Sequence, residues 1–280
     1  MAQTVLVTGA GGYIGRHVVT ALLERGLTVK ALDLRLDGVD ERAEKVHLEL
    51  FSGDTDIYDQ MGRPDVVLHM AWRDGFKHAS SAHLDDLAKH VNLIENLYAG
   101  GLNQLAVMGT MHEVGYWEGA IDENSPCAPA SLYGIAKNAL REATFLSAQA
   151  HGAIAQWIRA YYIVGDDKFG NSIFSKLLAA AEEGRTTFPF TTGKNRYDFI
   201  SVDGLGEQIA AIVDQTEVDG IINACTGEPM TLAERVEAYI RDNDLGITLE
   251  YGAFPDRPYD SPGVWGDPTK IRRILASSAS

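Results

Sequence analysis

The sequence has few cysteines, fewer basic than acidic residues and no long apolar run. Its 280 residues include two cysteines, Cys127 and Cys225, which excludes a disulfide framework and a cysteine-rich zinc site. No apolar run approaches the roughly 20 residues of a membrane-spanning helix, and no signal peptide precedes the first apolar segment. We therefore expect a cytoplasmic protein that does not enter a membrane.

Charge and histidine spacing exclude two further kinds of partner. The 39 acidic and 24 basic side chains give a formal net charge of −15, whereas nucleic-acid binding depends on Lys and Arg at phosphates. The eight histidines show no metal-ligand spacing such as His-x-x-x-His. We expect neither a nucleic acid nor a metal, although one or two local arginines would suffice for an anionic small molecule.

Short apolar segments alternate with helical patterns along the first two thirds of the chain. The predicted strands are residues 4–7, 28–32, 45–49, 66–70, 104–108 and 155–158, and the predicted helices are residues 14–25, 85–99 and 131–150. Apolar strands that alternate with helices are typical of a parallel, doubly wound sheet. The expected fold class is therefore α/β.

The last third of the chain is less regular. It predicts helices at residues 174–183, 205–215 and 231–242 and a strand at residues 220–223. Thr231 and Glu234 have the spacing of a capping box at the start of the third of these helices. We expect a smaller, mixed α/β lobe here.

A glycine-rich turn follows the first predicted strand. Gly9, Gly12 and Gly15 have the spacing that allows a tight turn, close approach of a pyrophosphate and packing of helix on strand. The next helix would point its N-terminal amides at the phosphates. We therefore predict a dinucleotide-binding domain of residues 1–165, to which residues 194–223 return, and a substrate-binding lobe of residues 166–193 and 224–280.

The second predicted strand ends in an acidic residue. Asp33 lies 18 residues after Gly15, where a carboxylate accepts hydrogen bonds from the adenosine ribose and repels a 2′-phosphate. This favours NAD as the cofactor. Arg35 is close enough to meet a 2′-phosphate, so NADP stays open as the alternative.

Tyr133 and Lys137 are four residues apart in a predicted helix and therefore share one face of it. An ammonium beside a phenol lowers the phenol's pKa, ordinarily about 10, toward the range in which a proton can be passed near neutral pH. The spacing alone occurs on many helix surfaces. The spacing matters here because the glycine-rich turn at the start of the chain predicts a dinucleotide-binding domain.

The glycine pattern together with Tyr133-x-x-x-Lys137 resembles the extended short-chain dehydrogenase/reductases, which include NAD-dependent nucleotide-sugar epimerases, dehydratases and reductases. The resemblance covers nearly the whole chain and implies the Rossmann form of the doubly wound sheet. Ser52-Gly53-Asp54 resembles the segment whose acid meets the adenine. His69-Met70-Ala71-Trp72 resembles the His-x-Ala-Ala segment beside the cofactor, and residues 159–165 resemble Arg-x-x-Asn-Val-Tyr-Gly, which places Tyr161 by the nicotinamide. The implied cofactor-binding residues are Gly9, Gly12, Tyr13, Ile14, Gly15, Asp33, Asp54, Met70, Ala71, Trp72, Tyr133, Lys137 and Tyr161.

The resemblance also implies a catalytic set of Thr110, Tyr133 and Lys137. Thr110 takes the place of the family's Ser or Thr by its register against Gly115. The 4,6-dehydratases of the family carry Asp-Glu directly after this residue, and here the two places hold Met111 and His112, so we do not expect dehydration. His112 and Glu113 flank Thr110 and are candidates for contact with the substrate.

These motifs look most like reductases that act on nucleotide-linked 4-keto-6-deoxyhexoses, with Tyr133 as the acid/base. A 4-epimerase with tightly bound NAD is the alternative, and a non-catalytic dinucleotide sensor is a second one. Arginine suits a diphosphate because its guanidinium donates two parallel hydrogen bonds. The family also implies a homodimer. The candidate substrate-binding residues are Thr110, Met111, His112, Asn171, Arg196 and Arg257.

Overall fold

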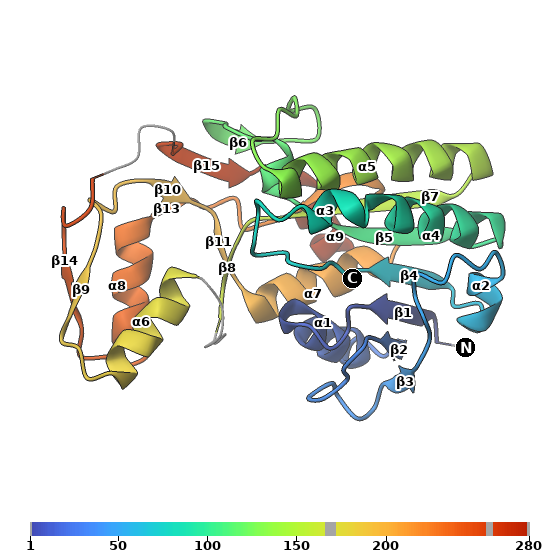
Figure 1. Cartoon of the computed structure of the whole chain (residues 1–280), viewed down its shortest axis with the longest axis horizontal. Helices are drawn as coiled ribbons and strands as arrows, with labels where there is room; N and C mark the ends of the chain where they lie inside the picture. The colour runs from blue at the N-terminus through green and yellow to red at the C-terminus, as the bar shows by residue number, and fades with distance from the viewer. Residues whose placement is uncertain (1, 166–171, 256–259, 279–280) are drawn as a thin grey trace.

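A parallel sheet of seven strands forms the centre of the protein, with the strand order β12-β7-β5-β4-β1-β2-β3 (Figure 1). The structure is a computed structural model that describes residues 2–165, 172–255 and 260–278. The predicted α/β fold with a doubly wound parallel sheet is confirmed. The strands of this sheet are β1 (Thr4–Thr8), β2 (Thr28–Leu32), β3 (Glu44–Val46), β4 (Val66–His69), β5 (Gln104–Thr110), β7 (Ile154–Ala160) and β12 (Gly220–Ala224).

Helices cover both faces of this sheet (Figure 1). One face carries α1 (Tyr13–Glu24), α7 (Val202–Val213) and α9 (Thr269–Ser278), and the other carries α3 (Ala82–Asp85), α4 (Leu87–Ala99) and α5 (Leu132–His151). A short helix, α2 (Ile57–Gln60), packs on α4. Successive strand residues point to opposite faces, so Val5 and Val7 join one apolar core and Leu6 joins the other.

The chain changes direction across the sheet between β1 and β4. From β1 it proceeds to β2 and β3 on one side, and β4, β5, β7 and β12 follow on the other side. Parallel strands of this kind leave a crevice at their carboxyl ends where the order reverses. Thr8 at the end of β1 pairs with His69 at the end of β4, so the glycine-rich turn and the segment after β4 meet at this point.

The predicted mixed lobe is present at the left of Figure 1. It contains α6 (Ile173–Glu182) and α8 (Leu232–Asp242), β9 (Thr187–Pro189) and β14 (Thr248–Glu250), around a core of its own. The predicted capping box of Thr231 and Glu234 closes the start of α8. The remaining short strands are β6 (Gly119–Ile121), β8 (Tyr162–Val164), β10 (Arg196–Tyr197), β11 (Phe199–Ser201), β13 (Met230–Thr231) and β15 (Gly263–Gly266).

The buried carboxylate of Asp198 joins three loops between the lobe and the large sheet. One of its oxygens accepts from the Thr226 amide at 2.9 Å and hydroxyl at 2.6 Å, and the other accepts from the amides of Gly227 at 2.9 Å and Gly266 at 3.3 Å. Hydrogen bonds to a charged acceptor are stronger than neutral ones. Asp198 therefore fixes β10 and β15 against the end of β12.

The end of the chain differs from the predicted division into lobes. Residues 224–280 were assigned to the lobe, but α9 packs on α7 and β12 of the large sheet. Ile271 and Ile274 on α9 are buried in the core on that face. The burial of these two side chains brings the C-terminal helix back to the dinucleotide-binding part.

Within the described residues, no helix has the length and apolar character to span a membrane.

Candidate active site

The glycine-rich turn is built for close packing of backbone on backbone. Gly9 has a φ of +75°, which favours glycine, and a Cβ there would lie 2.7 Å from the Ala71 nitrogen. A Cβ on Gly15 would lie 2.1 Å from the Gly9 oxygen. Gly12 is the N-cap of α1, and no side chain within the described ranges caps this end of the helix. The amides and positive dipole end of α1 therefore suit an anion such as a pyrophosphate.

Asp33 lies directly over this turn. One carboxylate oxygen accepts from the Gly11 amide at 3.0 Å and the other from the Leu34 amide at 2.6 Å. Gly11 is close to the next loop as well, because a Cβ there would lie 1.8 Å from the Arg35 oxygen. The acid, the turn and the helix end thus form one cradle, which fits the predicted adenosine ribose and pyrophosphate.

Asp54 lies in the loop that precedes α2. Its carboxylate accepts from the Gln60 amide at 3.3 Å and its carbonyl accepts from the Asn96 amide at 3.1 Å. Asp54 lines a shallow hollow together with Phe51 and Asn92. The carboxylate is exposed there, which is compatible with the predicted contact to an adenine.

The segment after β4 is held by the hydroxyl of Thr8. That oxygen accepts from the amides of Met70 and Ala71, both at 3.2 Å. It lies 2.8 Å from His69 Nδ1, to which it donates, because its acceptor positions serve the two amides. Met70 and Ala71 are therefore fixed beside the glycine-rich turn.

Thr110 and Tyr133 come together because α5 approaches the end of β5 closely. Thr110 is the last residue of β5, and Tyr133 lies in the first turn of α5, which Ser131 caps by accepting from the Gly134 amide at 3.1 Å. A Cβ on Gly134 would lie 2.4 Å from the His112 oxygen, so only glycine permits this approach. The Thr110 side chain acts on the Tyr133 phenol and favours its ionised form.

Lys137 is one helical turn from Tyr133 and buried. Its Nζ donates to the Met108 oxygen at 2.7 Å and lies 3.8 Å from the centre of the Trp72 ring. Burial lowers the pKa of Lys137 to about 7. The expected lowering of the Tyr133 pKa does not occur in this arrangement: burial raises it to about 12, against the opposing effect of the Thr110 side chain. Desolvation of the phenol is the largest effect on this pKa.

Three histidine rings surround Tyr133. The His78 ring is stacked on the Tyr133 ring with centroids 4.9 Å apart, and the His83 centroid lies 5.2 Å away. His112 lies 4.4 Å from His78, and the Tyr133 amide donates to the His78 oxygen at 3.1 Å. Burial lowers the pKa of His112 to about 4 and also lowers that of His78. Both are neutral at pH 7, so the ring of Tyr133 meets no imidazolium from them.

The sequence did not single out His78 as a neighbour of Tyr133. It is one of three histidines that follow β4, with His83 on α3 and His90 on α4. The contact depends on the turn that brings the His78 carbonyl to the N-terminus of α5.

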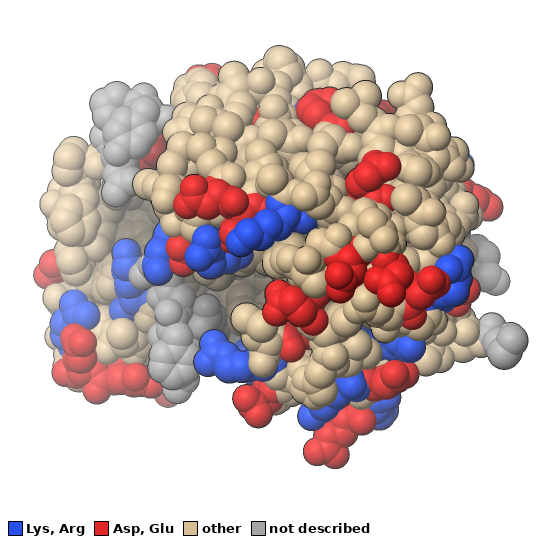
Figure 2. All heavy atoms as spheres, turned by 45° about the vertical axis from the view of Figure 1, so that its right-hand side comes forward, with Lys and Arg blue, Asp and Glu red and all other residues tan. Residues whose placement is uncertain are grey.

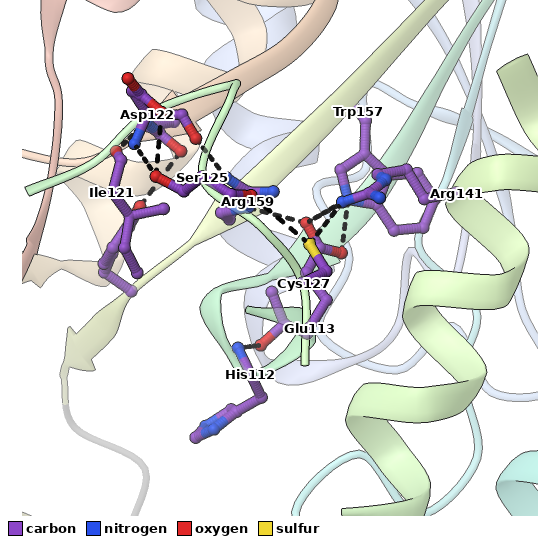
Figure 3. A network of polar contacts seen from close by, with 12 residues as sticks. His112, Glu113, Ile121, Asp122, Ser125, Cys127, Arg141, Trp157 and Arg159 are labelled. Atoms are coloured by element: carbon purple, nitrogen blue, oxygen red, sulfur yellow. Dashed lines mark hydrogen bonds and ion pairs between the residues drawn. The ribbon is translucent and has the colours of Figure 1, made fainter. Parts of the chain in front are cut away.

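Glu113 does not face the substrate, contrary to its status as a candidate (Figure 3). Its side chain is buried, and its carboxylate accepts from Arg159 Nε at 2.7 Å and from Trp157 Nε1 at 2.8 Å. Arg141 lies 3.7 Å away and donates to Cys127 Sγ at 3.0 Å. Burial raises the pKa of Glu113 and the two guanidinium groups oppose that rise. Glu113 thereby fixes the turn that carries Thr110 and His112 to β7.

Other predicted residues lie further from this centre. Tyr161 is buried, and its hydroxyl donates to the Asn223 side chain at 3.1 Å, which gives its predicted cofactor contact no support. Arg196 on β10 is exposed and donates to the Pro229 oxygen at 2.9 Å. Met111 is buried beside Thr110. Asn171 and Arg257 lie outside the described residues.

Figure 2 shows a hollow between the lobe and the body of the large sheet, with side chains of both charges, Lys and Arg as well as Asp and Glu, near its rim. No group of acidic, histidine or cysteine side chains in the described part of the chain is arranged to hold a metal ion.

The sequence matches a protein-family model and curated relatives. Residues 5–225 match the model of the NAD dependent epimerase/dehydratase family. The dTDP-6-deoxy-L-talose 4-dehydrogenase (NAD(+)) of Aggregatibacter actinomycetemcomitans is 42% identical over 271 residues, which cover 94% of this chain and 99% of that protein. Probable UDP-arabinose 4-epimerase 1 of Oryza sativa subsp. japonica is 26% identical, with 97% of this chain and 74% of that protein covered.

Solved structures share the fold. The Thermus thermophilus UDP-glucose 4-epimerase in complex with NAD superposes with a TM-score of 0.78 at 24% identity, covering 97% of this chain and 92% of that one. The UDP-glucose 4-epimerase of Thermotoga maritima with UDP-glucose gives a TM-score of 0.81 at 21% identity, with the same coverage of 97% and 92%.

Proposed function

Because the chain belongs to the NAD-dependent epimerase/dehydratase family, we propose that it is an oxidoreductase that transfers hydride between NAD and C4 of a nucleotide-linked 6-deoxyhexose. The observation that carries this proposal is the placement of Tyr133 beside Thr110 and one helical turn from Lys137, at the edge of the sheet that also holds the glycine-rich turn. The relative that is 42% identical is named for this chemistry, so dTDP-6-deoxy-L-talose and its 4-keto form are the first substrates to test.

The cradle formed by Gly9, Gly12, Gly15 and Asp33 is proposed to hold the dinucleotide. The open N-terminus of α1 would bind the pyrophosphate and the Asp33 carboxylate the adenosine ribose. When bound, NADH would supply the hydride for the C4 carbonyl. NADP stays the alternative cofactor.

Tyr133 is proposed as the proton donor to the C4 oxygen. With its pKa raised to about 12, the phenol holds its proton at neutral pH, which suits the reducing direction. Thr110 would donate a hydrogen bond to the same oxygen as negative charge develops on it. Lys137 would bind the nicotinamide ribose and, when charged, stabilise the phenolate that remains after proton transfer.

The substrate's diphosphate is proposed to lie against Arg196, whose exposed guanidinium retains donors beyond its bond to Pro229. His112 and Met111 would border the sugar next to Thr110. We also propose a homodimer in the cytoplasm; α5 exposes Ile135 and Leu146, which suits burial against a second copy.

The proposal is tested with purified protein, NADH and a panel of 4-keto sugar nucleotides, by the loss of NADH absorbance. Tyr133→Phe should lower kcat by about 100- to 10,000-fold while NADH still binds. Tyr116→Phe, a change at an exposed tyrosine, serves as the control. Wild-type turnover in Tyr133→Phe would refute the role of Tyr133.

A 4-epimerase is the second candidate, supported by the 26% identity to a probable UDP-arabinose 4-epimerase. It would interconvert two sugar nucleotides with no added cofactor and no net change in NADH. Stoichiometric NADH oxidation with a 4-keto sugar nucleotide would exclude it. A non-catalytic sensor is disfavoured, since Tyr133, Lys137 and Thr110 are all present and close together.

A further inference from the structure

We propose that Trp72 is a positioning residue for hydride transfer, because its indole face holds the Lys137 amine beside Tyr133 and His83 holds the indole in place. This inference rests on the function proposed above. It goes beyond that function because it assigns to the side chain of Trp72 a role in placing the Lys137 amine.

The contact between Trp72 and Lys137 is short and shielded from solvent. Lys137 Nζ lies 3.8 Å from the centre of the Trp72 ring, and only 3% of the lysine is exposed. A buried ammonium needs compensating partners. The Met108 oxygen at 2.7 Å supplies one, and the negative face of the indole supplies another. Together they fix the amine from two sides.

Trp72 also contacts the other member of the pair. Its ring meets the Tyr133 ring edge to face, with centroids 6.2 Å apart and an angle of 73° between the planes. One side chain therefore touches both Tyr133 and Lys137. A shift of the indole would change the placement of both.

The indole is itself fixed at its edge and on its face. Its Nε1 donates to His83 Nδ1 at 3.0 Å, which requires that this nitrogen carry no proton. His83 Nε2 then donates to the Lys77 oxygen at 3.0 Å. On its face, the indole stacks on His90 with centroids 4.5 Å apart.

The groups around Lys137 determine how much of it is charged. Glu113 favours the ammonium, whereas burial lowers the pKa of Lys137 to about 7. His69 and His90 face it from β4 and α4 and are neutral, because burial lowers the pKa of both. Tyr133 faces it from its own helix. Because the pKa of Lys137 is about 7, stabilisation of the ammonium by the indole face raises the charged fraction of Lys137 near neutral pH.

Three variants separate a positioning role from a structural one. Trp72→Leu keeps apolar bulk but removes the π face, Trp72→Phe keeps a π face, and Trp117→Leu removes a partly buried indole that donates to the Ala120 oxygen elsewhere. We expect Trp72→Leu to lower kcat about tenfold with little change in the KM of the sugar nucleotide. Its alkaline limb of kcat should move down by about one pH unit, since a lost cation–π contact favours the neutral amine. Trp72→Phe should recover most of both. The same kcat and pH profile in Trp72→Leu as in Trp117→Leu would overturn the inference.

A second measurement needs neither cofactor nor substrate. The ultraviolet difference spectrum of the indoles, followed against pH, should show an inflection near pH 7 as Lys137 loses its charge over Trp72. The inflection should be absent in Lys137→Met and in Trp72→Phe. Its absence from the wild-type protein overturns the inference even if sugar nucleotides are reduced, and it decides the matter if Trp72→Leu does not fold. Failure to reduce any sugar nucleotide, with the inflection present, would instead refute the proposed function.

Discussion

Replacing Glu113 by Gln should destabilise the protein strongly, because it removes the only negative charge that accepts from the buried guanidinium of Arg159 in the part of the chain that the structure describes. Both side chains have 0% exposure, and the carboxylate also accepts from Trp157 at 2.8 Å. A glutamine of the same shape would turn an amide donor toward one of these donors. The Nη2 atom of Arg159 already lacks a hydrogen-bond partner among the described residues, so the loss cannot be made good nearby.

The magnitude follows from the burial. Removal of one partner of a buried ion pair costs about 3–5 kcal/mol, since the other charge stays desolvated and unpaired. For a chain of 280 residues, an unfolding entropy of about 2 cal/mol/K per residue converts each kcal/mol into roughly 2 °C of melting temperature. Glu113→Gln should therefore lower Tm by about 6–10 °C.

Thermal unfolding of three variants tests this value. Asp59→Asn breaks an exposed pair with Arg63 and should cost less than about 1 kcal/mol. The double variant Glu113→Gln/Arg159→Met should cost less than the sum of its single changes, because it removes both charges. A Tm of Glu113→Gln within 1 °C or so of that of Asp59→Asn would refute the reasoning.

Three further predictions concern pH, packing and cofactor choice. Burial lowers the pKa of His69, and that of His90 to about 3, whereas both protonate near pH 6.5 in the unfolded chain. Stability should thus be full above pH 6.5 and fall below it by up to about 1.4 kcal/mol per pH unit for each histidine; urea unfolding at several pH values checks this, and an unchanged slope in His90→Asn would contradict it. Gly15→Ala should weaken NADH binding in a fluorescence titration and lower stability by about 1–3 kcal/mol, because the new Cβ would lie 2.1 Å from the Gly9 oxygen; wild-type binding would argue against the cradle. Asp33→Ser should raise the kcat/KM ratio of NADPH to NADH by roughly tenfold through loss of charge repulsion, and an unaltered ratio would mean that Asp33 does not meet the ribose.

The large sheet could be predicted because its signals are local. Six apolar segments and the glycine-rich turn lie within short windows of the sequence, and all six became strands of the parallel sheet. The ends were less accurate. The fifth strand was predicted to stop at residue 108, but Gly109 and Thr110 continue it by pairing with Arg159 and Ala160 of β7. That pairing depends on a distant segment.

The short strands and the contacts within the site could not be predicted from local sequence patterns. Strands of two or three residues such as β10 and β13 are too short to show a period. The four-residue spacing placed Tyr133 and Lys137 on one helix face, but it could not show that burial would raise the Tyr133 pKa or that Lys137 would lie against Trp72. These outcomes depend on the packing of α3, α4 and α5 on the sheet, which the residues of each segment do not reveal alone.

The ion pair of Glu113 with Arg159 also bears on the order in which the protein becomes active during synthesis. The two residues are 46 positions apart, and Thr110 and Tyr133 both leave the ribosome before Arg159 does. A nascent chain that ends before β7 lacks Arg159 and Trp157, which donate to Glu113, and has no neighbour for the far edge of β5. Domains assemble as their late, non-local pairings form. The enzyme should therefore become active only after β7 has joined the sheet. A chain truncated before that strand should be inactive and open to proteolysis.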